Sequence, residues 1–64
     1  MEKLIATNPM IVEARAGIAR TQKERSQAIF SKNFKQAEDL TRSLNNQKIE
    51  LKEAIRSLKA AGWQ

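Results

Sequence analysis

The stretch FSKNFKQ, residues 30–36, decides whether this chain of 64 residues folds back on itself. Ser31 or Asn33 can cap a following helix, and asparagine also tolerates the left-handed backbone conformation found in tight turns. We therefore predict an all-α antiparallel helical hairpin with a turn at residues 31–33. Because the stretch contains no glycine or proline, a single unbroken helix over residues 9–61 is the alternative.

The start of the first helix is marked by Asn8-Pro9. Asparagine is a preferred N-cap, and proline suits the first helical position, where its missing N–H costs nothing. These residues divide the chain into an N-terminal arm (1–8) and a helical hairpin (9–64). The helices of the hairpin are expected over about 9–30 and about 34–61.

The end of the second helix is marked by Gly62, because glycine is the usual residue just past a helix C-terminus. In that register Trp63 and Leu58 occupy two positions that often share an apolar contact. We predict that the tryptophan is a structural lid. A binding aromatic is the competing interpretation.

The second helix carries an apolar seam of about four heptads, which is typical of coiled coils and bundles. Gln47 forms a polar layer in its middle, and such layers often fix register. Phe34 and Ile55 widen the seam, and Phe30 and Phe34 are assigned to the core rather than to base stacking. The two seam positions are Phe30, Ala37, Leu44, Leu51 and Leu58, and Asn33, Leu40, Gln47, Ala54 and Ala61.

The first helix has a weaker seam, with a polar middle in RTQKERSQ, residues 20–27. Folding the chain about residue 32 places Ile18 near Gln47 and brings the arm residues Leu4 and Ile5 within reach of the C-terminal end. The hairpin is thus expected to have two apolar ends and a mixed polar centre. The seam residues of the first helix are Ile11, Ala14, Ile18, Thr21, Arg25 and Ala28.

The segment NPMIVEARAGIAR, residues 8–20, is apolar or small almost all round. One partner helix leaves Val12, Ala16 and Ala19 on a second face. Because two helices alone cannot enclose a core, we predict association into an oligomeric bundle, with a dimer as the commonest form. A loosely folded monomer is the alternative. The predicted interface residues are Ile11, Ala14, Gly17, Ile18, Leu44, Leu51, Ile55 and Leu58.

The composition argues against catalysis and metal binding. The chain has no cysteine and no histidine, which removes thiolate ligands and the commonest metal ligand and general base. No segment reaches the roughly 20 apolar residues of a membrane span, and the N-terminus lacks the apolar run of a signal peptide. We expect a cytoplasmic protein that is not an enzyme and holds no cofactor.

The net charge is +5, from 12 lysine and arginine residues against 7 aspartate and glutamate residues. Lys48, Lys52, Arg56 and Lys59 follow one another at successive helical turns and could line up phosphates. The alternative is a solvated helix face whose cations complement the helix dipole. The candidate anion-binding residues are Arg15, Arg20, Lys48, Lys52 and Arg56.

Two functions follow from these patterns. The first is a small oligomeric helical binding protein that regulates or inhibits a protein partner, with Val12 and Ile49 as outward apolar anchors. The second is an anion-binding helical oligomer that binds nucleic acid or sequesters a small nucleotide through its basic residues.

Overall fold

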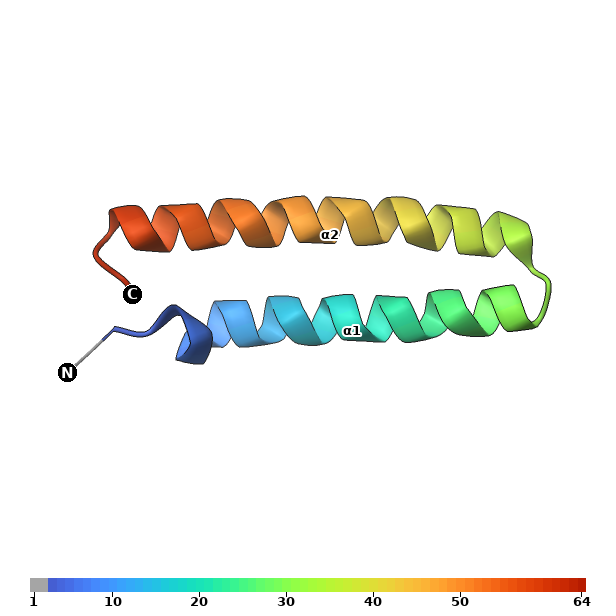
Figure 1. The fold of residues 1–64 in the computed structure, drawn as a ribbon, viewed down its shortest axis with the longest axis horizontal. Helices are drawn as coiled ribbons and strands as arrows, with labels where there is room; N and C mark the ends of the chain where they lie inside the picture. Colours follow the sequence, from blue (N-terminus) through green and yellow to red (C-terminus); the bar gives the residue numbers. More distant parts are fainter. Residues whose placement is uncertain (1–2) are drawn as a thin grey trace.

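The computed structural model describes residues 3–64, which form two long antiparallel helices and a short N-terminal turn (Figure 1). The 3₁₀ turn η1 spans Ile5–Thr7, helix α1 spans Pro9–Phe30 and helix α2 spans Phe34–Ala60. The two helices lie side by side along their length, giving a rod of 48 × 16 × 11 Å. The predicted all-α hairpin is confirmed, and the alternative of one unbroken helix is wrong.

Helix α1 begins where the Asn8-Pro9 pair predicts. The Asn8 side-chain oxygen accepts a hydrogen bond from the Met10 backbone N–H at 2.9 Å, and Pro9 occupies the first turn. The first N–H groups of a helix have no partner within the helix, so such a cap is worth about 1 kcal/mol.

The turn between the helices is closed by two backbone hydrogen bonds. The Asn33 N–H donates to the Ala28 carbonyl at 2.8 Å, and the Lys32 N–H donates to the Ile29 carbonyl at 3.0 Å. Together they form a Schellman motif, whose C′ residue takes a left-handed conformation. Lys32 holds that position with φ of 61°. The left-handed residue is therefore a lysine, at a cost of roughly 1 kcal/mol, and not the asparagine that the sequence suggested.

Asn33 caps α2, which settles the choice that the sequence left open between Ser31 and Asn33. Its side-chain oxygen accepts a hydrogen bond from the Gln36 backbone N–H at 3.3 Å. Its side-chain amide also donates to Gln36 Oε1 at 2.9 Å. Ser31 instead ends α1. Ser31 is thus the C-cap of α1 and Asn33 is the N-cap of α2.

The far end of α2 closes as predicted. Gly62 has φ of +97°, the Trp63 N–H donates to the Leu58 carbonyl at 2.9 Å, and the Gly62 N–H donates to the Lys59 carbonyl at 3.1 Å. These are again the two bonds of a Schellman motif. Trp63 is half-buried.

The N-terminal arm is tied to this end of α2, opposite the turn (Figure 1). The Gln64 N–H donates to the Lys3 carbonyl at 2.8 Å, and the Ile5 N–H donates to the Gln64 carbonyl at 2.7 Å. We call this pair of bonds the terminal clasp. Ile5 is buried, as expected for an arm that reaches the end of the hairpin. Leu4 was expected to reach it as well, but it is 40% exposed.

The core between the helices is thin. Ile11 is the one fully buried large side chain among the described residues, with a relative exposure of 0%. Near the middle, Arg25 Nε donates to Thr41 Oγ1 at 2.6 Å, and that hydroxyl donates to the Ala37 carbonyl at 2.8 Å. The centre of the hairpin is therefore partly polar, as the sequence indicated, and these two hydrogen bonds satisfy part of it. The buried core residues are Ile5, Ile11, Thr21, Ala28, Ala37 and Leu44.

The assignment of Phe30 and Phe34 to the core is wrong. Phe30 is 92% exposed and Phe34 is 65% exposed. Phe30 is the last residue of α1 and Phe34 the first of α2, so the seam ends here and no facing helix covers them. Asn33 and Ala61, which the heptad pattern also placed on the seam, are exposed at the two ends of α2 for the same reason.

Candidate binding surfaces

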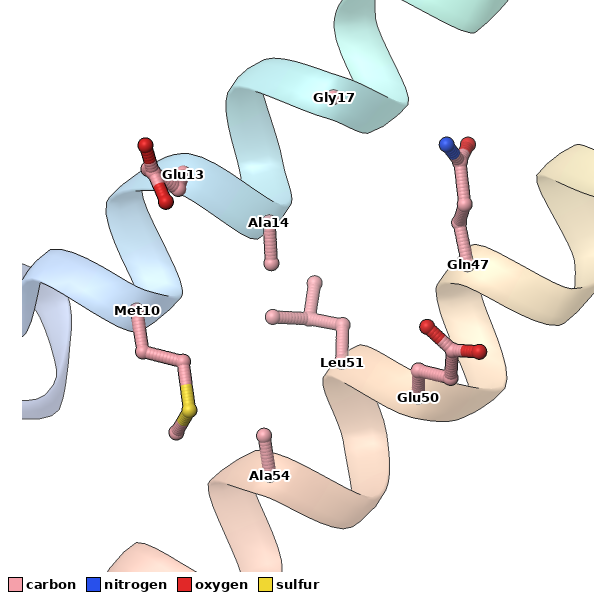
Figure 2. A pocket seen from close by; sticks show the side chains of 8 residues that line it. All are labelled: Met10, Glu13, Ala14, Gly17, Gln47, Glu50, Leu51 and Ala54. Atoms are coloured by element: carbon pink, nitrogen blue, oxygen red, sulfur yellow. The ribbon is translucent and has the colours of Figure 1, made fainter.

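One side of the hairpin carries an open groove between the two helices, with a volume of about 430 Å³ (Figure 2). Ala14 of α1 and Leu51 of α2 point toward one another across it, and Met10 and Ala54 lie beside them. Most of the side chains in the groove are small or apolar, and carboxylates stand on both helices. Its lining residues are Met10, Glu13, Ala14, Gly17, Gln47, Glu50, Leu51 and Ala54.

Gly17 lines the groove, and the packing of a single hairpin does not require a glycine at this position. A Cβ added there would lie 3.9 Å from Gln47 Nε2, which is an ordinary contact distance. Alanine would therefore fit, and a glycine inside a helix costs roughly 1 kcal/mol relative to alanine. Packing within the described chain does not repay that cost.

Gln47, at the same level on α2, has an unmet hydrogen bond. Its Oε1 is buried, and no donor within residues 3–64 reaches it. A buried acceptor left without a partner costs about 1–3 kcal/mol. Gly17 and Gln47 thus place two unfavourable features side by side at the end of the groove that lies nearer the turn.

The predicted oligomer-interface residues fall into two groups. Ile11 and Leu44 are only 0% and 7% exposed, so their surface is already used within one hairpin. Six others are half-buried and keep part of their surface open. Of these, Ala14, Gly17 and Leu51 meet in the groove. The half-buried residues are Ala14, Gly17, Ile18, Leu51, Ile55 and Leu58.

The second face predicted for α1 is exposed in the hairpin. Val12 is 51% exposed and Met10 is 52% exposed, and Ala16 and Ala19 are also exposed. On α2, Ile49 is 56% exposed. Scattered exposed apolar residues are common on protein surfaces, so single residues of this kind carry little weight.

The candidate anion-binding residues are all exposed, and the structure gathers only some of them. Lys52 and Arg56 lie with Lys59 and Ile55 around a shallow hollow of about 240 Å³ on α2. We call this feature the basic hollow. The remaining candidates, Arg15, Arg20 and Lys48, do not line it.

A third surface, which the sequence analysis missed, lies at the turn. Ile29, Phe30 and Phe34 are 41%, 92% and 65% exposed, and Lys32 and Lys35 lie beside them in the sequence and are exposed too. We call these five residues the turn patch. The predicted turn at residues 31–33 could have indicated this surface. A seam residue at the very end of a helix has no residue of the other helix opposite it, so it stays exposed.

The comparisons with known proteins assign no function to these surfaces. No protein-family model, no curated protein and no solved structure matches the chain. Within the described part of the chain, no cluster of acidic side chains is arranged to hold a metal ion. None of its helices has the apolar length that crossing a bilayer requires.

Proposed function

We propose that this chain is a small, non-enzymatic, oligomeric helical binding protein that regulates or inhibits a protein partner and contacts that partner through the turn patch. The exposure of Phe30 and Phe34, 92% and 65%, is the observation that supports this proposal most directly. Both exposed aromatic residues stand at the same end of the hairpin, Phe30 as the last residue of α1 and Phe34 as the first residue of α2.

The energetics favour a partner for these side chains. Burying a phenylalanine side chain contributes about 1.5–3 kcal/mol. Within one hairpin Phe30, 92% exposed, gains almost none of this and Phe34, 65% exposed, gains only a part. Binding energy at protein interfaces is concentrated in a few well-buried anchors at the centre of the contact. Phe30 and Phe34 have the size and exposure of such anchors, and the short turn between them holds their backbones in fixed positions.

The charges around the turn patch define the partner further. Lys32 lies between the two aromatic residues in the sequence and Lys35 follows them, and no acidic residue occurs between positions 25 and 37. Complementary charge at the rim of an interface speeds association and excludes wrong partners. We therefore expect the partner to offer an apolar pocket with an acidic rim.

A comparative pull-down tests the proposal. The wild-type chain, the double variant Phe30→Ser/Phe34→Ser and the control Ile49→Ser are immobilised and exposed to lysate from cells that naturally contain the protein. Ile49 is also an exposed apolar residue, but it lies on the length of α2, away from the turn. A protein recovered by the wild type and by Ile49→Ser but lost with the double variant supports the proposal. Equal recovery by all three proteins would overturn it.

A second candidate function is anion binding at the basic hollow. Lys52, Arg56 and Lys59 place three cations around one depression, which suits a phosphate group of a nucleic acid or nucleotide. Calorimetry at low salt with duplex DNA, single strands and cyclic nucleotides tests this function. Lys52→Glu should abolish any binding there, whereas Arg15→Ala should leave it unchanged; no heat with any ligand would eliminate this candidate.

A further inference from the structure

We propose that the groove is covered by a second copy of this chain, turned end for end about a two-fold axis that runs across both helices at the level of Gly17 and Gln47. In this arrangement α1 lies antiparallel on α1 of the second copy, α2 lies antiparallel on α2, and the two hairpins form a four-helix bundle. The inference deepens the oligomeric part of the proposed function by naming the face and the register. It does not depend on the turn patch.

Gly17 supplies the first argument. Its missing side chain leaves space that the hairpin itself does not require, since a Cβ would fit at 3.9 Å from Gln47 Nε2. On a two-fold axis each residue meets its own copy. Two glycines facing each other allow the α1 helices to cross closely, whereas a bulky side chain such as leucine at that position would meet its own copy.

Gln47 supplies the second argument. Its buried Oε1 has no donor within the described chain, and its side chain lines the groove. A glutamine amide carries both a donor and an acceptor, so two amides related by a two-fold axis can exchange two hydrogen bonds. A rotation of the Gln47 side chain toward the axis would join it to its copy and satisfy the unmet acceptor.

The charges on α1 supply the third argument. Glu13 and Arg20 are seven residues apart and therefore lie along the same edge of the helix. In an antiparallel pair centred on Gly17, residues before it face residues after it at nearly equal separation. Glu13, four positions before Gly17, then lies beside Arg20 of the other copy, three positions after it. The symmetry creates this opposite-charge pair twice.

The other closed arrangement is disfavoured by charge. If both turns lay at the same end, α1 of one copy would lie on α2 of the other. Glu13 and Glu50 line the same groove from opposite helices, so this arrangement would set Glu13 against Glu50 of the second copy. In the proposed register Glu50 lies near Ser43 and Leu44 instead, and neither residue is charged.

The hairpin is large enough for this interface. Its broad face measures 48 × 16 Å, which is comparable with the roughly 800 Å² per partner of a standard protein interface. The half-buried groove residues Ala14, Leu51 and Ala54 would be buried by it.

Disulfide trapping tests the axis directly, because the natural chain contains no cysteine. A residue on a two-fold axis meets its own copy, so Gly17→Cys should form a covalent dimer under mild oxidation with oxidised glutathione. A disulfide requires Cα atoms within about 7 Å. Ile49→Cys, with its exposed side chain on α2, is the matched control and should remain a monomer on a non-reducing gel. Cross-linking of both variants to the same extent, or of neither, would overturn the proposal.

Charge reversal tests the register without a cross-link. Glu13→Arg should weaken the dimer at least about tenfold in sedimentation equilibrium, since it places arginine beside arginine twice. Glu13→Arg/Arg20→Glu should restore the wild-type association, because the exchanged charges again face opposite charges. Circular dichroism checks that the helices persist. A wild-type monomer at all concentrations, or a double variant no tighter than Glu13→Arg, would contradict the inference.

The turn patch separates the two proposals. Phe30→Ser/Phe34→Ser should leave the dimer intact. Glu13→Arg should leave the recovery of a protein partner through the turn patch unchanged. Loss of the dimer in the turn variant would show that the second copy occupies the turn patch and not the groove.

Discussion

The two ends of this hairpin are finished in different ways although both close with a Schellman motif. At the open end the terminal clasp holds the arm against α2, Ile5 is buried and Trp63 is half-buried. At the turn end Phe30 and Phe34 are exposed. An apolar residue near a helix end is therefore buried only where another segment of chain reaches it, whatever its place in the heptad.

The largest expected effect lies at the open end, where Ile11 is fully buried. Ile11→Ala should lower the free energy of unfolding by about 2–4 kcal/mol, because it removes buried methyl groups and leaves a cavity. Thermal unfolding followed by circular dichroism at fixed protein concentration measures the change. Val12→Ala, at an exposed neighbouring position, is the control. Equal melting temperatures for the two variants would show that the core is not at Ile11.

A smaller loss is expected from the arm. Ile5→Ala should destabilise the protein by about 1–2 kcal/mol, because Ile5 is buried but lies on a short arm that can close part of the cavity left behind. Leu4→Ala, its exposed neighbour, should change the melting temperature little. The two variants together show whether the arm contributes to stability, and identical curves for both would mean that the clasp holds the arm without useful packing.

The turns themselves should respond in opposite directions. Lys32→Gly should stabilise the protein by about 0.5–1 kcal/mol, because glycine adopts φ near 61° without the strain that a lysine side chain causes. Gly62→Ala, at φ of +97°, should destabilise it by a similar amount. Urea denaturation of both variants measures this, and a change of the same sign in both would contradict the assigned geometry.

The smallest effect is expected at the turn patch. Phe30→Ser should change the free energy of unfolding by less than about 0.5 kcal/mol, because the side chain is already 92% exposed. A loss above about 1.5 kcal/mol in the same urea experiment would mean that Phe30 is buried in solution by another copy of the chain.

Much of this fold could be predicted from local signals. Asn8-Pro9 and Gly62 act through backbone geometry that depends on nearby residues alone, so the helix ends near them were placed correctly. The seam succeeded where helices face each other, from Ile11 to Ala28 and from Ala37 to Leu58. The seam wrongly predicted that Phe30 and Phe34 are buried, because the heptad pattern does not show where the facing helix ends.

The candidate surfaces were less predictable because they depend on distances between helices. Sequence reasoning named Gly17 and Gln47 separately, as a small residue and as a polar layer. That they lie side by side, with space for a Cβ and an unmet acceptor, follows only from the packed hairpin. The same applies to the basic hollow, since spacing alone did not distinguish Lys52 and Arg56 from Lys48.

The terminal clasp also has a consequence for amide hydrogen exchange. The N–H groups of Ile5 and Gln64 are held by bonds that join the arm to Gln64, which follows the end of α2, so they become protected only when the arm and the segment after α2 are both in place. If the arm detaches while the helices stay paired, these two amides exchange faster than those in the middle of α1. If the arm leaves only when the whole hairpin unfolds, all of them exchange at one common rate. The ratio of these rates measures how strongly the arm is coupled to the hairpin.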